Sequence, residues 1–392
     1  MNPRPSLADQ AQRWTAAGLI SAETAAKILA FEAGEDRRST LRWPVFLAMI
    51  FGGILLAAGV TLFVAAHWSE LSPASRFSLL LFMVAVFHIG GASLATRFPA
   101  LSTTLHAVGT ITLGAAIFLT AQIFNLHENW ATGVLLWALG AAFGYALLHD
   151  WVQAAILALL APAWLISQWL ITTESHFGGN RPLSVGLILT ALTYLSARIG
   201  DQQSTPRRTL VWIGALALLP STGAAIAFAM EEHNAYTIYN RPHLSSATLF
   251  FGWTVAFAAP LLLAWLLRGR AAIINFLWAI WAYLLVLSAS HSQGSTSTTY
   301  RRNMGITLVL YALCAFGSVG LVVWGLNEKR KERLNLGIAA FAISVLFFYF
   351  DSFMGKLGRS ASLLILGVLC LAGGYVLEVT RRKLMAKMET NQ

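Results

Sequence analysis

The chain has 392 residues, of which 57% are apolar and only 11% are charged. Because about a quarter of the residues in an average soluble protein are charged, this composition excludes an ordinary soluble domain and predicts an all-α, polytopic membrane protein. The formal net charge is +10, but the basic residues are spread thinly over several loops and tails. That distribution argues against nucleic acid as a partner and favours attraction to anionic membrane lipids.

The first 42 residues predict a small cytoplasmic domain made of a helical hairpin and a basic linker. Within it, residues 6–33 have the pattern of two short helices, with Gly18 as the stop of the first and Ser21 as the N-cap of the second. The second helix carries an apolar stripe. Such a stripe either packs against its own protein or the membrane surface, or binds a protein partner.

Residues 43–380 predict a bundle of about twelve transmembrane helices, because apolar runs recur that are long enough to cross a hydrocarbon layer of about 30 Å. The predicted spans are residues 43–66, 76–96, 104–124, 132–149, 151–171, 183–199, 208–229, 246–267, 271–290, 304–326, 334–352 and 360–379. The fourth and fifth spans are divided only by His149 and Asp150. The connection at residues 288–303 is rich in serine and threonine, which predicts a mobile loop. Residues 381–392 predict a basic cytoplasmic tail.

The distribution of basic residues predicts the orientation of the chain. With the N-terminus inside, twenty of the 27 basic residues face the cytoplasm, where Lys and Arg accumulate. Both termini are therefore predicted to be cytoplasmic. One basic connection contains Lys329, Arg330, Lys331 and Arg333 and is interpreted as a loop that faces lipid headgroups. Eight tryptophans near span ends are interpreted as interfacial anchors: Trp43, Trp68, Trp130, Trp151, Trp169, Trp212, Trp265 and Trp324.

Four stretches of the chain carry a family resemblance. They are AAGLISAETAAKIL, FGGILLAAGVTLFVAAHWSELSPASR, ITLGAAIFLTAQIFNLHENWATGVLLWALGA and YFDSFMGKLGRSASLLILGVLCLAGGYVLE. They resemble the lead-in helices, the first membrane hairpins and the closing hairpin of a prokaryotic membrane-protein family, domain of unknown function 2157. The chain departs from that family at His67 and Trp68, where we expect Asn before Trp. The resemblance implies a prokaryotic plasma (inner) membrane location, and it brings no catalytic residue.

Histidines and carboxylates gather on the predicted external face, among them His67, Glu70 and His127. Imidazole and carboxylate together suggest metal or proton chemistry. A transition-metal site, however, needs three or four ligands and usually a local spacing such as His-x-x-x-His, which the chain lacks. We therefore predict no metal site, no cofactor and no catalytic residue.

Polar residues inside the spans are the stronger candidates for a binding site, because they are costly in hydrocarbon and usually face a bundle interior or a cavity. Asp351 is the sharpest of them, since a carboxylate at the end of an apolar helix requires a cation, which Lys356 or Arg359 would supply. Such a pair either gates a pathway or orients the final hairpin. The other candidates are His88, His106, Gln122 and Gln168.

Three prolines, Pro162, Pro220 and Pro260, fall well inside predicted spans, and each removes a helix hydrogen bond and frees a carbonyl. Around Pro220 the run LPSTG adds Thr222 and a glycine, ingredients of the broken helices that bind substrate in secondary transporters. Neighbouring side chains also satisfy freed carbonyls in ordinary membrane helices.

These features favour a transport or permeation role for a small solute. The alternative is a non-catalytic scaffold or sensor that binds a partner protein through the N-terminal hairpin. A membrane-embedded enzyme that acts on lipid-linked substrates ranks third, because no catalytic motif is present.

Overall fold

A computed structural model describes most of the chain in two compact units, Met1–Arg76 and Phe77–Gln392. The described residues are 7–39, 51, 55, 62, 71–125, 129–173, 176, 179–198, 204–239, 243–291, 293–296, 299–302, 304–352, 364, 367–368, 371–375, 378–379 and 381–382. Each unit is described by itself.

The first unit contains two helices in the segment where the sequence predicts a hairpin, α1 (Leu7–Ala16) and α2 (Ala22–Ser39). Gly18 has a φ of 70°, a left-handed conformation that ends a helix at little steric cost for glycine. The Ser21 hydroxyl accepts a hydrogen bond from the Thr24 N–H at 3.1 Å, so Ser21 caps α2 as predicted.

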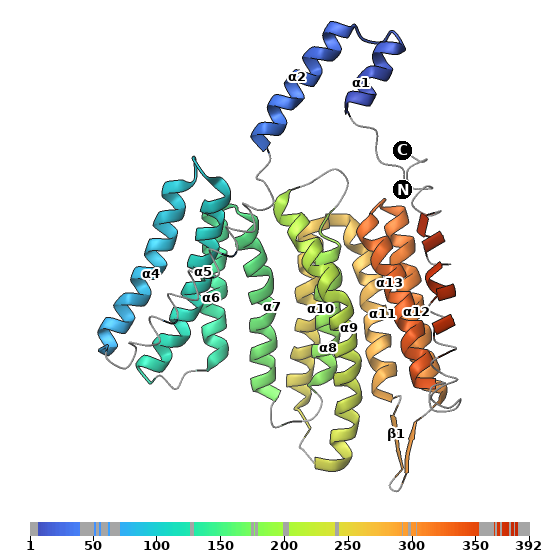
Figure 1. Ribbon diagram of the computed structural model, residues 1–392. Coiled ribbons are helices and arrows are strands. Elements are labelled where there is room, and N and C mark those ends of the chain that lie inside the picture. Colours follow the sequence, from blue (N-terminus) through green and yellow to red (C-terminus); the bar gives the residue numbers. More distant parts are fainter. Residues whose placement is uncertain are drawn as a thin grey trace. The chain divides into compact units, whose positions relative to one another are not determined.

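The second unit is a bundle of helices (Figure 1). It begins within α4 (Pro73–Leu94). In chain order there follow α5 (Pro99–Ile123), α6 (Trp130–Leu148), α7 (Trp151–Thr173), α8 (Asn180–Leu195), α9 (Thr205–Tyr239), α10 (Ser246–Arg268), η2 (Gly269–Ala272), α11 (Ile273–His291), β1 (Gln293–Thr296), β2 (Thr299–Arg302), α12 (Met304–Asn327) and α13 (Lys331–Ser352). The predicted all-α class holds for the described residues, apart from the short antiparallel β1–β2 hairpin.

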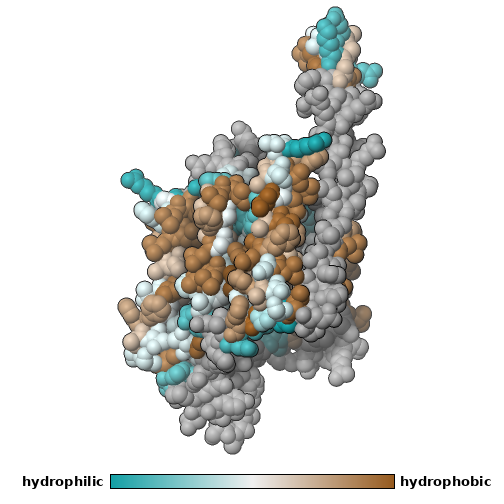
Figure 2. Space-filling model, turned by 90° about the vertical axis from the view of Figure 1, so that its left-hand side faces the viewer, coloured by the Kyte–Doolittle hydropathy of each residue, from teal (hydrophilic) through white to brown (hydrophobic). Residues whose placement is uncertain are grey.

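Eight helical segments of the described residues are long and apolar enough to cross a membrane, and one of them, Ser246–His291, comprises α10 and α11 in succession. The prediction of about twelve spans is therefore not confirmed. The predicted span at 43–66 lies almost wholly outside the described residues, and much of that at 360–379 does too. Figure 2 shows mostly hydrophobic residues across the middle of one face, as expected for a surface in contact with lipid.

The boundary predicted at His149 and Asp150 is confirmed. His149 has a φ of 51° and ends α6, and α7 begins at Trp151. Two connections differ from the prediction. Helix α9 continues to Tyr239, because residues with good helix propensity follow its apolar run. The connection predicted to be mobile contains the β1–β2 hairpin, whose paired positions run from Gln293 with Arg302 to Thr296 with Thr299.

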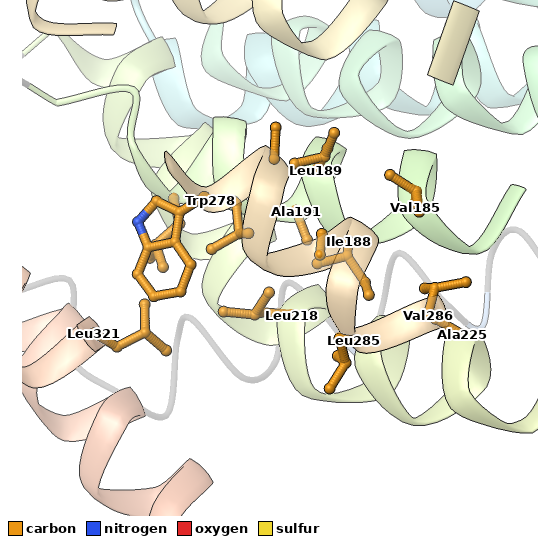
Figure 3. Close-up of a cluster of buried hydrophobic side chains, with 14 of the residues drawn as sticks. Val185, Ile188, Leu189, Ala191, Leu218, Ala225, Trp278, Leu285, Val286 and Leu321 are labelled. Carbon is orange, nitrogen blue, oxygen red and sulfur yellow. The ribbon is translucent and has the colours of Figure 1, made fainter. Parts of the chain in front are cut away.

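The main apolar core surrounds α8, the shortest of the bundle helices (Figure 3). The residues of α8 are buried or half-buried on every side, because the helix packs against α9, α10 and α11. Its contributions are fully or almost fully buried: Val185, Ile188, Leu189, Leu192 and Leu195. The contact with α9 is so close that a Cβ on Gly214 would lie 2.3 Å from the Leu195 backbone nitrogen. Helix α8 therefore anchors the helices that form the sites described next.

Candidate functional site

A cavity of about 590 Å³ lies between α9, α11, α12 and α13. Two residues selected from the sequence, Thr222 on α9 and Asp351 on α13, belong to its lining. They are 129 positions apart in sequence (351 minus 222), and the packing of α9 near α13 brings them to one cavity. Most of the other lining residues are apolar.

Four aromatic rings line the cavity, those of Trp281, Tyr311, Phe347 and Phe350. The Trp281 ring is fixed against α12, because its Nε1–H donates to the Leu313 carbonyl at 2.9 Å. It also packs on the backbone of Gly317, where a Cβ would come within 2.4 Å of the ring. The lining of the cavity thus contains aromatic rings, and the Trp281 ring is held in place by α12.

The hydroxyl groups of the lining present oxygen lone pairs and not donors. Thr222 donates to the Leu218 carbonyl at 2.8 Å. Ser318 and Ser344 likewise donate to the carbonyl four residues earlier in their own helices, each at 2.8 Å. With their protons engaged, these hydroxyls are left as acceptors. Together with the Asp351 carboxylate and the aromatic faces, they give the lining oxygen acceptors and π faces.

The other predicted site residues do not reach this cavity. Pro220 is inside α9 as predicted, but it is exposed and does not belong to the lining. Gln122 is exposed in the last turn of α5. Four predicted residues lie outside the described residues, and their interactions stay predictions: His67, Glu70, His127 and Arg359.

The remaining intramembrane candidates fall into two places. Gln168 lines a second cavity of about 310 Å³ between α7, α8 and α10. His88 and His106 contact each other between α4 and α5. The prediction that polar residues inside spans face neighbouring helices or cavities therefore holds for these three residues.

A neighbouring side chain satisfies the carbonyl that one of the three predicted prolines frees. Pro162 has no N–H to donate to the Ala158 carbonyl, and the Tyr194 hydroxyl donates to that carbonyl instead, at 2.7 Å. The Thr193 hydroxyl also donates to the carbonyl of Pro260 itself, at 3.2 Å. Both donors belong to α8, so the backbones of α7 and α10 near these prolines are hydrogen-bonded to the core helix.

Replacing Tyr194 with phenylalanine is expected to cost about 0.6–1.7 kcal/mol of unfolding free energy, the range of hydrogen bonds between membrane helices. In a Pro162→Ala background the new backbone N–H satisfies the Ala158 carbonyl, so the same replacement should cost less. A double-mutant cycle on detergent-solubilised protein measures the difference. Equal costs in both backgrounds would show that the hydroxyl does not replace the missing backbone donor.

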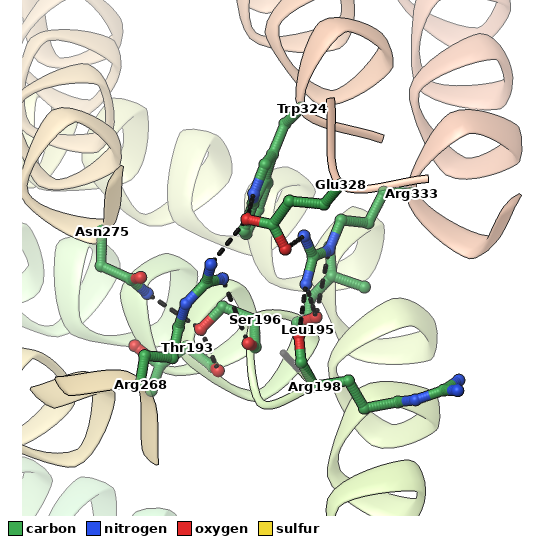
Figure 4. Close-up of polar contacts among 9 residues, drawn as sticks. All are labelled: Thr193, Leu195, Ser196, Arg198, Arg268, Asn275, Trp324, Glu328 and Arg333. Atoms are coloured by element: carbon green, nitrogen blue, oxygen red, sulfur yellow. Dashed lines mark hydrogen bonds and ion pairs between the residues drawn. The ribbon is translucent and has the colours of Figure 1, made fainter. Parts of the chain in front are cut away.

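A buried cluster of charges joins the end of α12 to the ends of α8 and α10 (Figure 4). One carboxylate oxygen of Glu328 accepts from Arg268 at 2.6 Å, and the other accepts from Arg333 at 2.5 Å. The Trp324 Nε1–H also donates to Glu328 at 2.6 Å. The Arg333 guanidinium stacks over the Trp324 ring, 3.9 Å from its centroid, a favourable cation–π geometry.

The two arginines also bind the end of α8. Arg333 donates to the Leu195 carbonyl at 3.2 Å, and Arg268 donates to the Ser196 carbonyl at 3.1 Å. These carbonyls have no partner within a helix, because they lie in its last turn and cap. A cation near a helix C-terminus is also favoured by the helix dipole. The cluster therefore locks α8, α10 and the α12–α13 turn together.

The arrangement keeps Glu328 ionised. Partial burial acts to raise the pKa of Glu328, but the Arg333 charge and the hydrogen bonds from Arg268, Arg333 and Trp324 outweigh it. The net pKa lies below the ordinary value. The carboxylate is thus charged at neutral pH and compensates two arginines at once.

This cluster corrects two sequence-based interpretations. Trp324 was expected to be an interfacial anchor, but it is only 2% exposed. Arg333 was expected to face lipid headgroups, but it is 1% exposed and paired. The signal in the sequence is Glu328, an acid within a basic connection at the end of an apolar helix. A count of basic residues in the loop does not reveal that Glu328 pairs with arginines.

The apolar helices, the proline-freed carbonyl satisfied by a neighbouring side chain and the buried polar contacts define a polytopic α-helical membrane protein. Residues 12–152 match the model of a family described as predicted membrane protein, DUF2157, which confirms the resemblance seen in the sequence. The match ends at the start of α7, so the cavity and the charge cluster lie beyond it. Neither the curated proteins nor the solved structures contain a match.

Proposed function

We propose that this membrane protein binds a small organic cation in the cavity between α9, α11, α12 and α13 and moves it across the membrane. The observation that carries the proposal is the lining itself. Four aromatic residues, hydroxyl oxygens and the Asp351 carboxylate surround about 590 Å³ of space. Aromatic faces and a carboxylate are the groups that recognise quaternary ammonium ions, and pockets of this volume suit ligands of drug-like size.

The charge cluster supports a gate at one end of the pathway. Leu321 lines the cavity, and Trp324 of the cluster follows three residues later, about one turn along α12. On α13, Asp351 lines the cavity at the opposite end from Arg333. With the predicted cytoplasmic N-terminus, the cluster closes the cytoplasmic side and Asp351 lies toward the outside. Transport then requires the α12–α13 turn to separate from α8 and α10.

Binding is tested with phenylalkyl-trimethylammonium ions and their uncharged phenylalkanol isosteres, by the thermal midpoint of the purified full-length protein. A ligand at one hundred times its dissociation constant adds about 2.7 kcal/mol of stability. We expect the cations to raise the midpoint and the alkanols to raise it much less. Asp351→Asn should remove the preference, while Asp150→Asn, a carboxylate outside the cavity, should leave it unchanged. Equal shifts by cations and alkanols would contradict cation recognition.

Occupation of the cavity is tested by filling it. Gly223 lines the cavity, and a Cβ there would meet no atom within 4 Å, so Gly223→Leu adds volume from an unobstructed Cβ. We expect it to abolish the cation-induced shift, whereas Gly223→Ala keeps most of it. Translocation is measured as uptake of the permanently charged cation into proteoliposomes. Binding without uptake would reject transport and leave a ligand sensor, which is the alternative function.

The alternative has one observation of its own. Unit Met1–Arg76 is compact by itself, and it exposes Leu19 (72%) and Trp14 (38%), side chains suited to a protein contact. The enzyme hypothesis rests on His67, Glu70 and His127, which lie outside the described residues.

A further inference from the structure

A pair of histidines lies between α4 and α5, in a part of the bundle that does not line the cation cavity. Their Nδ1 atoms are 3.1 Å apart, and their ring centroids are separated by 5.4 Å. Each ring packs on a glycine of the opposite helix. A Cβ at Gly91 would lie 2.9 Å from the His106 ring, and one at Gly109 would lie 2.8 Å from the His88 ring.

This packing is reciprocal, because each helix carries the same short pattern. His88 precedes Gly91 by three residues, and His106 precedes Gly109 by three residues. Residues three apart share a helix face. Each helix therefore presents one imidazole ring and one glycine, on which the ring of the other helix packs. The two patterns face each other, so each ring packs on the glycine of the opposite helix. A histidine that faced lipid would not require a glycine opposite it.

Neutral polar groups bind the backbone next to the His106 ring. The His106 carbonyl accepts from the Gln153 amide at 3.2 Å and from the Thr110 hydroxyl at 3.1 Å. The Trp137 Nε1–H donates to the Thr110 carbonyl at 2.8 Å. His106 is 6% exposed and Gln153 is fully buried. Uncharged groups of α6 and α7 thus bind the α5 backbone at and one turn after His106.

The charged and titratable residues of these elements lie elsewhere. Helices α4 to α7 contain, besides the pair, Arg76 at the start of α4 and Tyr145 near the end of α6. Arg97 lies in the α4–α5 connection, and His149 and Asp150 form the α6–α7 turn. Of these residues, Asp150 lies three residues, or about one helical turn, before Gln153, the residue that contacts the His106 carbonyl. In the described part of the bundle, the group whose charge directly opposes protonation of one imidazole is therefore the other imidazole.

Only certain protonation states fit a contact between two Nδ1 atoms. In the neutral pair one Nδ1–H donates and the other Nδ1 accepts, so the rings are opposite tautomers. One added proton keeps this hydrogen bond and makes it charge-assisted. A second added proton places N–H groups on both facing atoms and two like charges 3.1 Å apart.

We propose that His88 and His106 form a binding site for a single proton within the membrane bundle. The site lies about two helical turns from the α4–α5 connection, because His88 is six residues before the end of α4 and His106 is seven residues after the start of α5. Loading a second proton breaks the contact and weakens the attachment of α4 to α5. The site is independent of the proposed cation cavity.

The test is nuclear magnetic resonance of the full-length protein in detergent micelles, with ¹⁵N in its nine histidines. We expect a scalar coupling between the two Nδ1 nuclei of the wild-type protein, which directly detects the hydrogen bond. On acidification the pair should take up protons in two steps separated by more than about one pH unit, as strongly interacting sites do. Absence of the coupling, or simultaneous titration of both rings, would overturn the proposal.

Variants assign the steps to the pair. In His106→Gln, His88 should titrate in one step, and His88→Gln should do the same to His106. His149→Gln, which lies outside the pair, should leave both steps unchanged. If His106→Gln leaves the titration of His88 as in the wild type, the two rings do not share a proton. The coupling experiment needs no variant, so a variant that fails to fold leaves the test intact.

Discussion

Replacing Glu328 with glutamine is expected to destabilise the protein by about 3–5 kcal/mol, the usual cost of breaking a buried ion pair by removing one partner. The change leaves two arginines charged, with side chains that are only 2% exposed. It also weakens the hydrogen bonds that Glu328 accepts from Arg268, Arg333 and Trp324. The measurement is the denaturant midpoint in detergent micelles, compared with that of the wild type.

A matched control is Glu378→Gln. Glu378 also accepts from two arginines, Arg381 and Arg382, but all three side chains are solvent-accessible, so its removal should leave the midpoint unchanged. Equal effects of the two replacements would show that burial of the Glu328 cluster does not determine its contribution.

The pH dependence of stability gives a second measurement for Glu328. Because its folded-state pKa is lowered, its contribution is fully present above the ordinary glutamate pKa of about 4.3 and is lost as the pH falls through the lowered value. The wild type and Glu328→Gln should therefore differ at neutral pH and converge in acid. A difference that persists in acid would mean that the charge of Glu328 is not what stabilises the cluster.

Physical reasons explain which parts of the candidate site could be predicted from the sequence. Thr222 and Asp351 stand out because each interrupts an apolar run, and polar groups in spans tend to face interiors. Long-range packing determines which helices bring these two residues together. The local periodicity of the sequence does not predict that packing. The aromatic lining of the cavity could not be predicted for the same reason. In the sequence, Trp281 and Phe347 look like ordinary apolar residues of a span.

The charge cluster could not be predicted from a count of charges. The connection after α12 reads as a basic cytoplasmic loop, and the orientation rule treats all its Lys and Arg residues alike. Folding separates them. Arg333 inserts against Leu195 and Trp324, whereas Lys329 lies in the turn after α12 with a φ of 54°. The boundary between α6 and α7 was easier to predict, because His149 and Asp150 are the only polar residues between two apolar runs.

Replacing Gly214 with alanine is expected to cost at least about 3 kcal/mol, the upper part of the range for overpacking a core. The new Cβ would lie 2.3 Å from the Leu195 nitrogen and 2.6 Å from the Ala191 carbonyl oxygen. Both are backbone atoms, so a change of rotamer cannot relieve the clash, and α8 must move away from α9. That movement also displaces the Leu195 carbonyl, which accepts from Arg333.

Because one displacement affects both features, Gly214→Ala and Glu328→Gln should be non-additive: the double variant should lose less stability than the sum of the single losses. The control is Gly223→Ala on the same helix, where a Cβ meets no atom within 4 Å. That variant should be as stable as the wild type or slightly more stable, because alanine has the higher helix propensity. If Gly214→Ala is as harmless as Gly223→Ala, the close approach of α8 to α9 does not exist in the folded protein. The charge cluster would then lack the fixed α8 end on which its two arginines depend.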